Sequence, residues 1–214
     1  MRVLLVDDHP LTRKGMAAVL ERESDMCVCG EAADNQEAIE KILASKPDVA
    51  IVDLALKKSD GLELVKDIRA RFPKVLVLVV SMQDEFLYAE RALRSGASGF
   101  VSKDEAADRL VEAVRHLLRG GAYLSQQVAT HVAARVAGHP RSGSLPALDT
   151  MTDRELQVFQ FIGDGLGRHQ IAQRLHLDVN TVETYRSRIK EKLQLKNALE
   201  LRQCAIHARL GVSS

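Results

Sequence analysis

The chain has 214 residues, of which 46% are hydrophobic and 28% charged, and a formal net charge of +1. This composition excludes a disordered chain and allows two modest hydrophobic cores. The longest apolar runs have the length of a strand, far below the ~20 residues that cross a bilayer, and no signal-peptide pattern opens the chain, so we expect a cytoplasmic protein with no membrane partner.

Short apolar runs alternate with amphipathic stretches of helical length over the first half of the chain. We expect strands at residues 3–6, 49–52, 75–80 and 100–102, and a further strand around Cys27 and Cys29. This alternation is typical of βαβ units, so the strands should lie parallel in one buried sheet. An odd number of cysteines gives no disulfide framework, and we expect Cys27, Cys29 and Cys204 to be small apolar fillers in a reducing compartment.

Polar side chains come directly after four of these strands. Asp7 and Asp8 follow the first strand, Asp53 the third, Ser81 the fourth and Lys103 the fifth. Because the carboxyl ends of parallel strands share one edge of the sheet, we expect these side chains to converge on one pocket. Taken singly, each Asp is equally typical of a turn or a helix N-cap.

Three carboxylates in one pocket repel one another unless a cation neutralises them. Carboxylate oxygens with remaining waters suit Mg²⁺ better than Zn²⁺. A carboxylate beside Mg²⁺ can attack phosphorus and form an aspartyl phosphate, while a hydroxyl and an ammonium bind the other phosphoryl oxygens. This chemistry assigns the nucleophile to Asp53 and the phosphoryl contacts to Ser81 and Lys103.

Five motifs stand out in this part of the chain, and four of them contain the pocket residues. They are Val-Asp-Asp-His-Pro at 6–10, Val-Asp-Leu at 52–54, Asp-Gly-Leu-Glu at 60–63, Val-Ser-Met at 80–82 and Gly-Ala-Ser-Gly-Phe-Val-Ser-Lys-Asp at 96–104. Together they resemble the receiver domain of two-component response regulators. The resemblance implies a five-stranded, parallel, doubly wound sheet of the flavodoxin-like type, and phosphorylation of Asp53 by a sensor histidine kinase.

The same resemblance assigns further roles around the phosphorylation site. It implies that Asp8, Asp53 and the backbone carbonyl of Ala55 hold Mg²⁺, with Asp7 acting mainly through water. It also puts Phe100 at the aromatic switch of the family, whose ring turns inward when the hydroxyl residue moves onto the phosphoryl group. An apolar ring at this position is equally compatible with an ordinary core residue.

Charge is distributed unevenly along the chain. Residues 1–124 hold 18 Lys and Arg against 21 Asp and Glu, a net charge of −3, whereas residues 125–214 hold 12 against 8, a net charge of +4. The C-terminal part is therefore the candidate for binding a polyanion. Residues 138–146 are rich in Gly, Pro and Ser, which is typical of a flexible linker.

We divide the chain accordingly into three parts. Residues 1–122 form the receiver, residues 123–147 a helical and flexible linker, and residues 148–214 the second domain. Within the linker, Ser125 is expected to cap a helix from Gln126 to about residue 137.

The C-terminal part predicts four short helices. Thr152 caps the first, with Glu155 completing a capping box, and the second lies around Ile171. The turn at 178–180 caps a third helix over 181–193, and the fourth runs from about residue 198 to 207. Two short helices joined by a tight turn, the second rich in Arg and Lys, have the outline of a helix-turn-helix.

The third of these helices has one apolar face and one polar face. Its apolar face carries Val182, Tyr185, Ile189 and Leu193. The candidate DNA contacts on the remaining surface are Thr181, Glu183, Thr184, Arg186, Ser187, Arg188, Lys190 and Lys192. The alternative is a basic solvated helix that packs on its neighbours, and Arg186, near the apolar stripe, could be structural and paired with Glu155.

Three motifs of this part resemble the LuxR-type DNA-binding domain. They are Met-Thr-Asp-Arg-Glu-Leu-Gln-Val-Phe at 151–159, Gln-Ile-Ala-Gln-Arg-Leu at 170–175 and Thr-Val-Glu-Thr-Tyr-Arg-Ser-Arg-Ile-Lys-Glu-Lys-Leu at 181–193. With the first resemblance they cover nearly the whole chain and imply a bacterial response regulator of the NarL/FixJ subfamily.

The two resemblances together imply a function. They imply a transcription regulator, not an enzyme, in which phosphorylated Asp53 frees the DNA-binding domain or promotes a homodimer on double-stranded promoter DNA. One alternative is a phosphotransfer or phosphate-sink protein whose C-terminal helices bind protein. A weaker one is constitutive DNA binding with a vestigial receiver, which the presence of all five pocket residues argues against.

Overall fold

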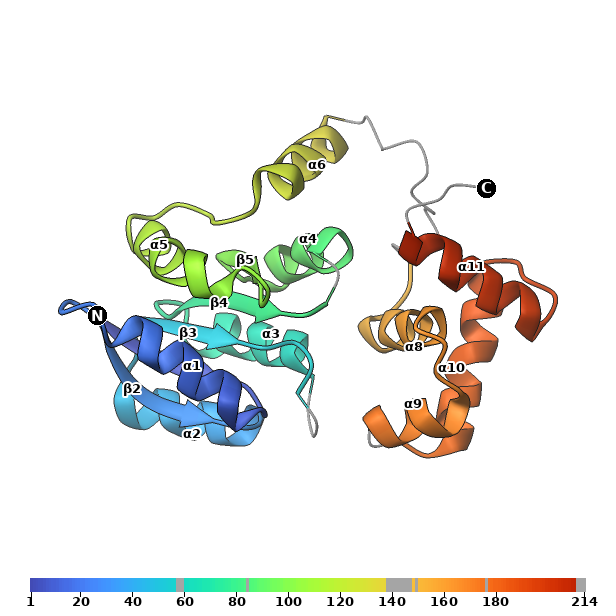
Figure 1. Ribbon diagram of the computed structural model, residues 1–214, viewed down its shortest axis with the longest axis horizontal. Coiled ribbons are helices and arrows are strands. Elements are labelled where there is room, and N and C mark those ends of the chain that lie inside the picture. The colour runs from blue at the N-terminus through green and yellow to red at the C-terminus, as the bar shows by residue number, and fades with distance from the viewer. Residues whose placement is uncertain (57–59, 84, 138–147, 149, 176, 211–214) are drawn as a thin grey trace. The chain divides into compact units, whose positions relative to one another are not determined.

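The structure is a computed structural model that describes residues 1–56, 60–83, 85–137, 148, 150–175 and 177–210. The chain forms two compact units, residues 1–133 and residues 134–214 (Figure 1). They divide within the segment that the sequence assigns to a linker, and the domain boundaries at residues 122 and 147 stay predictions. The expected flexible stretch at 138–146 lies outside the described residues.

The N-terminal unit is a doubly wound α/β fold, as the sequence predicts. All five strands are parallel and lie in the order β2-β1-β3-β4-β5. The strands are β1 (Arg2–Val6), β2 (Cys27–Ala32), β3 (Val49–Val52), β4 (Leu76–Ser81) and β5 (Gly99–Ser102). The helices are α1 (Pro10–Leu20), α2 (Asn35–Ser45), α3 (Gly61–Arg71), α4 (Glu85–Ser95) and α5 (Ala106–Leu118).

Helices cover both faces of this sheet. In Figure 1, α1 and α5 lie on one face, and α2, α3 and α4 lie on the other. Side chains alternate across the sheet, so Val3 and Leu5 of β1 point to the α1 and α5 face, where they pack with Met16 and Leu110. The central strands β1 and β3 are buried on both faces, which explains why their sequences are continuous apolar runs.

The edge strand β2 departs from the expectation for its cysteines. Its register against β1 shifts between Val28 and Gly30, so Cys29 is the extra residue of a bulge. Cys27 is exposed and Cys29 is partly buried, as is Cys204, and all three lie in the described part of the chain as free thiols. The prediction that Cys27 is a buried filler is wrong, because β2 lies at the edge of the sheet.

The helix α6 (Gln126–Val136) follows the N-terminal sheet. The hydroxyl of Ser125 accepts a hydrogen bond from the N–H of Val128 at 3.2 Å, which confirms the expected cap. Val128 is buried, and the ring of His131 meets Phe86 of α4 edge-on, with the ring centroids 5.9 Å apart. The start of α6 therefore packs on the N-terminal unit.

The C-terminal unit contains the four expected helices. They are α8 (Asp153–Gly163), α9 (Arg168–Leu175), α10 (Val179–Lys192) and α11 (Ala198–Leu210). Thr152 and Glu155 form the predicted capping box of α8, and Asp178 caps α10 through the N–H of Asn180. Across the described residues of the chain, the structure contains no helix long and apolar enough to cross a bilayer.

A buried ion pair joins the first and third helices of this unit. Glu155 is 2% exposed, and its Oε2 accepts from Lys192 Nζ at 2.6 Å and from the N–H of Thr152 at 2.8 Å. Burial alone would raise the pKa of Glu155, but these hydrogen bonds and the Lys192 charge outweigh it and lower the pKa. The structure pairs Glu155 with Lys192 and not with Arg186, the alternative that the sequence left open, because the C-terminal end of α10 is the part that reaches the start of α8.

Replacing Lys192 with Met should destabilise the C-terminal unit, because the buried Glu155 carboxylate loses its cation. We expect a loss of about 1–3 kcal/mol, the usual cost of leaving a buried charged group without its partner. Peptide-resolved hydrogen–deuterium exchange of the full chain measures this loss in α8 and α10 separately from the other unit. Lys196→Met, the same change at an exposed position, is the matched control, and equal exchange in both variants would contradict the role of the pair.

The lowered pKa of Glu155 also sets the direction of a pH dependence. Its stabilising effect is present above the usual carboxyl pKa of 4.5 and is lost as the pH falls through the lower pKa of the folded protein. The stability difference between the wild-type chain and Lys192→Met should therefore disappear in acid.

Candidate functional site

The carboxyl ends of the parallel strands bring the five predicted pocket residues together. Asp7 and Asp8 follow β1, Asp53 follows β3, Ser81 ends β4 and Lys103 follows β5. Adjacent strands are in register up to this edge, with Val6 opposite Val52 and Ser81 opposite Ser102. The side chains of Asp7, Asp53 and Ser81 are almost completely buried.

Asp53 is held from two sides by the residues that the sequence assigns to it. The hydroxyl of Ser81 donates to Asp53 Oδ1 at 2.9 Å, and Lys103 Nζ donates to Asp53 Oδ2 at 2.6 Å. The N–H of Ala55 also donates to Oδ1, at 3.2 Å. Hydrogen bonds to both carboxylate oxygens therefore fix the orientation of the Asp53 side chain.

Two buried carboxylates share a single ammonium in this pocket. Lys103 Nζ lies 2.6 Å from Asp7 Oδ2 and 2.6 Å from Asp53 Oδ2. Burial by itself would lower the pKa of Lys103, but the charges and hydrogen bonds of Asp53 and Asp7 outweigh it and raise the pKa. The lysine therefore stays charged at neutral pH.

The sequence did not indicate His9, which belongs to the same cluster. Its Nδ1 lies 2.8 Å from Asp8 Oδ1 and 3.3 Å from Asp7 Oδ1. One ligand atom from each of Asp7, Asp8, His9 and Asp53 lies within 4.8 Å of all the others. The only signal in the sequence was that His9 directly follows the two aspartates.

The donor set of this cluster fits a hard divalent cation. Three carboxylates offer oxygen atoms in one pocket. The ammonium of Lys103 and the imidazole of His9 lie beside them. Oxygen ligands of this kind are those that Mg²⁺ prefers. The residues present therefore suit the ion that the sequence predicts.

Phe100 is fully buried in β5, and the chain returns after α5 to cover the outer edge of this strand. The N–H of Phe100 donates to the carbonyl of Tyr123 at 2.8 Å, and the N–H of Tyr123 donates to the carbonyl of Ser98 at 3.1 Å. A side chain in place of Gly99 would collide with the Tyr123 carbonyl, with its Cβ only 2.7 Å away. The backbone at Phe100 is thereby joined to the segment that leads into α6.

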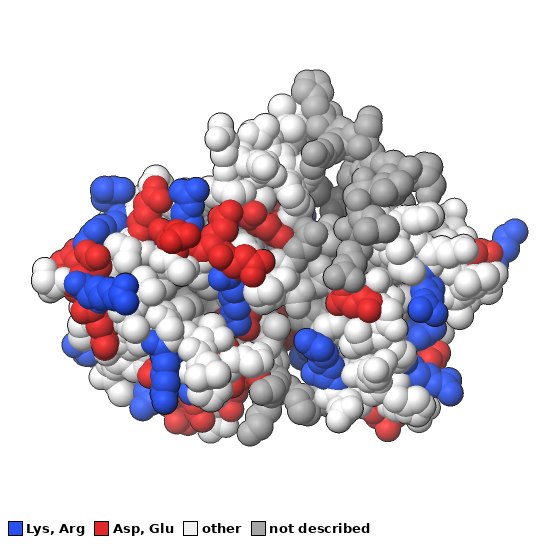
Figure 2. Space-filling model, in the orientation of Figure 1, with Lys and Arg blue, Asp and Glu red and all other residues white. Residues whose placement is uncertain are grey.

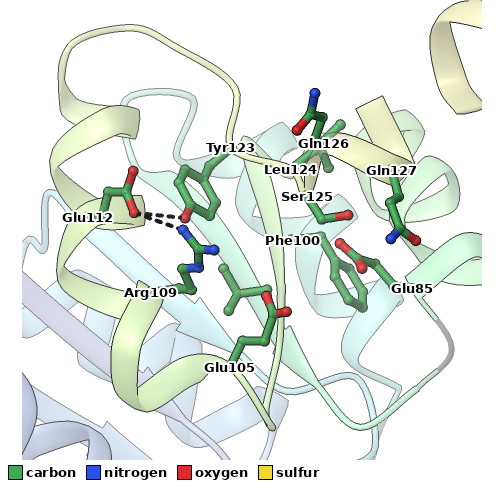
Figure 3. A pocket seen from close by; sticks show the side chains of 11 residues that line it. Glu85, Phe100, Glu105, Arg109, Glu112, Tyr123, Leu124, Ser125, Gln126 and Gln127 are labelled. Atoms are coloured by element: carbon green, nitrogen blue, oxygen red, sulfur yellow. Dashed lines mark hydrogen bonds and ion pairs between the residues drawn. The ribbon is translucent and has the colours of Figure 1, made fainter. Parts of the chain in front are cut away.

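A cavity of about 490 Å³ lies between β5, α5 and this segment (Figure 3). Figure 3 shows Arg109, Glu112 and Tyr123 at one end, and Glu85 and Gln127 at the other. The hydroxyl of Tyr123 donates to Glu112 Oε2 at 3.3 Å, and Arg109 Nη1 lies 3.5 Å from the same oxygen. Phe100 therefore borders a cavity whose other walls are the charged side of α5 and the start of α6.

The helix α10 presents the polar surface that the sequence predicts. Val182 and Ile189 are buried in the core, whereas Thr184, Ser187 and Arg188 are exposed. Figure 2 shows Lys and Arg side chains over α10 on the visible face of the C-terminal unit, and acidic side chains gathered near α5 in the N-terminal unit. The face of α10 that is free of the core is thus open to a partner.

Three charged side chains among the predicted DNA contacts on α10 form ion pairs within the unit. Glu183 Oε1 lies 3.7 Å from Arg186 Nε and 3.8 Å from Arg168 Nη1. Lys192 is engaged by Glu155 and also donates to the carbonyl of Thr150 at 2.8 Å. These bonds use two of the three N–H donors of the Lys192 ammonium.

Two family models match the chain. Residues 3–115 match the response regulator receiver domain, and residues 149–205 match the luxR family of bacterial regulatory proteins. Among curated proteins, the chain is 33% identical to the oxygen regulatory protein NreC of Staphylococcus haemolyticus over 98% of this chain and 99% of that protein. It is 37% identical to the transcriptional activator protein ExaE of Pseudomonas putida over 98% of each chain.

Solved structures show the same fold. A LuxR-family two-component response regulator from Aurantimonas sp. SI85-9A1 matches with a TM-score of 0.59 and 33% identity, over 64% of this chain and 97% of that one. RcsB of Salmonella enterica serovar Typhimurium, bound to promoter P1flhDC with the phosphomimetic BeF3-, matches with a TM-score of 0.66 and 24% identity, over 96% and 98% of the two chains.

Replacing Lys103 with Met should destabilise the N-terminal unit at pH 7, because two buried carboxylates lose their common cation. Millimolar MgCl₂ should restore more stability to this variant than it adds to the wild-type chain, since an ion that binds only the folded state stabilises it by mass action. Differential scanning calorimetry of the full chain with and without MgCl₂ measures both effects. Lys74→Met, at an exposed position, is the control, and a magnesium effect of equal size in all three proteins would refute the expectation.

Proposed function

The chain belongs to the DNA-binding response regulators, in which a receiver domain precedes a LuxR-type domain, and we propose that phosphorylation of Asp53 controls its binding to promoter DNA. The observation that carries this proposal is the geometry of Asp53, whose two carboxylate oxygens are held by Ser81 and Lys103. Positioning of this kind is most of what a protein contributes to phosphoryl transfer.

The phosphoryl donor in this proposal is a sensor histidine kinase. A carboxylate oxygen of Asp53 attacks the phosphorus, the bond from phosphorus to the histidine nitrogen of the kinase breaks, and an aspartyl phosphate results. Lys103, already 2.6 Å from Asp53 Oδ2, binds a phosphoryl oxygen and offsets the added negative charge. Ser81 binds a second oxygen through its hydroxyl.

Mg²⁺ fits this site, held by Asp8, Asp53 and the backbone carbonyl of Ala55, with Asp7 acting through water. When bound, the ion neutralises charge on the phosphoryl group. The protein itself accepts and releases this group, and we propose no further enzymatic activity. The kinase and the promoter together put its place of action in the bacterial cytoplasm.

The contact between Ser81 and Asp53 supports a route for the switch. A phosphoryl group on Asp53 takes the Ser81 hydroxyl away from Asp53 Oδ1 and draws it onto a phosphoryl oxygen. In this proposal the movement of β4 frees space for Phe100 of the neighbouring strand. Phe100 is bonded through its N–H to Tyr123, so a shift at Phe100 reaches the start of α6.

The exposed side of α10 supports DNA as the partner of the C-terminal unit. We propose that it enters the major groove and that Thr181, Glu183, Thr184, Arg186, Ser187, Arg188 and Lys190 face the DNA. We leave Lys192 out of this set because Glu155 engages it. The match of residues 149–205 to the luxR family favours DNA over protein as the target, against a phosphate-sink function.

We also propose a homodimer on DNA. One four-helix unit makes few base contacts, whereas two joined units gain the advantage of effective concentration at two half-sites. A solved structure of a relative consists of two RcsB dimers bound to two parallel DNAs. Phosphorylation would act by promoting this pairing or by freeing the C-terminal unit.

Acetyl phosphate with Mg²⁺ should phosphorylate the wild-type chain, and Asp53→Asn should abolish the modification, because the amide is not a nucleophile toward phosphorus. Intact-mass spectrometry measures the added phosphoryl group. Asp60→Asn, at a buried aspartate that caps α3, is the control and should leave phosphorylation intact. Full modification of Asp53→Asn would show that the acceptor lies elsewhere.

Changing Arg188 or Lys190 to Ala should weaken binding to all DNA sequences about equally, because both are expected to contact phosphates. Each lost contact should reduce the salt slope of binding by about one unit, measured by fluorescence anisotropy at several salt concentrations. Lys196→Ala is the control for a cation beyond α10. An unchanged slope would remove the residue from the interface.

Glu183→Lys should act differently, by altering which bases are preferred. A carboxylate in the major groove accepts from cytosine N4, so the change should be ~1–3 kcal/mol at one position of the site. A binding-site selection with the wild-type and variant chains measures it. The same base preference in both would rule Glu183 out as a base contact and leave its pairs with Arg168 and Arg186 as its role.

A further inference from the structure

His9 stands at the point where β1 passes into α1, beside the carboxylates of the pocket. Its backbone N–H donates to Asp7 Oδ1 at 2.7 Å, which fixes the residue against the pocket. Its side chain is 55% exposed, so the ring lies at the mouth and not in the core. Nδ1 points inward, 2.8 Å from Asp8 Oδ1 and 3.3 Å from Asp7 Oδ1.

Helix capping, the usual role of a side chain at this position, does not explain the orientation of the His9 ring. His9 is the N-cap of α1, a position that favours Ser, Thr, Asp or Asn because their side chains bond to the first N–H groups of the helix. Within the described chain, the His9 side chain makes no such capping bond, and Pro10 at the first turn lacks an N–H to be capped. The imidazole is directed at the carboxylates instead.

The spacing of the cluster fits one ion with an imidazole ligand. One atom each from Asp7, Asp8, His9 and Asp53 lies within 4.8 Å of the others. Ligand atoms on opposite sides of a single divalent ion are about 4–5 Å apart, since each metal–ligand bond is ~2.0–2.6 Å long. The separation of the His9 nitrogen from the carboxylate oxygens is therefore within the range for ligands of one ion.

We propose that His9 supplies an imidazole ligand to the divalent-cation site, so that this site favours first-row transition metal ions over Mg²⁺ more strongly than carboxylates alone would. Mg²⁺ prefers oxygen ligands, whereas imidazole suits Ni²⁺, Zn²⁺ and Cu²⁺, and affinities for nitrogen-containing sites rise along the series from Mn²⁺ to Cu²⁺. The inference rests on the metal centre of the proposed function and concerns which ion that centre selects.

The geometry also explains why the backbone needs no rearrangement. The bond from the His9 N–H to Asp7 holds the ring at the mouth, and rotation of the side chain moves Nδ1 from Asp8 toward an ion between the carboxylates. A transition metal ion would then have a ligand from the start of α1, which Mg²⁺ lacks. His9 is thus a specificity-determining residue for the cation.

Isothermal titration calorimetry of the unphosphorylated full chain with Mg²⁺, Mn²⁺, Co²⁺ or Ni²⁺ alone tests the proposal. His9→Ala should lower the affinity for Ni²⁺ and Co²⁺ by about tenfold or more, since even the loss of a group that only supports a metal ligand usually has an effect of this size. It should change the affinity for Mg²⁺ far less. The visible absorption spectrum of bound Co²⁺ should also change, because a nitrogen ligand is lost. His169→Ala, at an exposed histidine of α9, is the control for adventitious imidazole binding.

Two further outcomes separate this inference from the proposed function. Asp8→Asn should lower the affinity for every ion. If it lowers the affinity for none of them, the metal centre itself is wrongly assigned. A result in which Asp8→Asn lowers the affinity for all ions while His9→Ala leaves the ratio of Ni²⁺ to Mg²⁺ affinities unchanged would support the metal centre and refute the imidazole ligand. If His9→Ala raises the affinity for all ions equally, the imidazole competes with the ion for the carboxylates, which also overturns the inference.

Discussion

The pairing of one buried ammonium with two buried carboxylates is the interaction on which the N-terminal unit depends. Asp7 and Asp53 are 0% and 2% exposed, and Lys103 lies 2.6 Å from both. Buried charges are tolerated only when they are paired, so the sheet edge can hold a reactive carboxylate only while a cation accompanies it. In the proposed phosphorylation, the same lysine would offset part of the negative charge that Asp53 receives.

The C-terminal unit uses the same principle for a structural purpose. Glu155 is as deeply buried as Asp53, and Lys192 provides its cation from a different helix. The pocket pair is the one to which we assign a cation and a phosphoryl group, whereas at Glu155 the N–H of Thr152 and the Lys192 ammonium both bind Oε2. The difference in role follows from position, because the first pair lies at the open edge of a sheet and the second between packed helices.

In the proposed switch, communication out of the pocket passes through the edge strand β5. Tyr123 forms backbone hydrogen bonds with Ser98 and Phe100 at the start of this edge, so the strand that carries Phe100 is joined to the linker by backbone bonds. An edge covered in this way is protected from pairing with other chains, and it gives the proposed switch a short physical connection to α6. The cavity beside Phe100 provides room for the ring or its neighbours to shift without repacking the core.

Local signals in the sequence determined most of the fold and the positions of the pocket residues. In a parallel sheet, a polar residue that directly follows an apolar strand lies at the edge formed by the carboxyl ends of the strands. The capping box of Thr152 and Glu155 is also local, because its two residues are three positions apart. Features that depend on distant pairing were decided by the tertiary structure. The exposure of Cys27 follows from the edge position of β2, and the choice of Lys192 over Arg186 follows from how α10 packs on α8. The approach of Tyr123 to β5 likewise depends on where the folded chain brings its backbone, which no spacing in the sequence encodes.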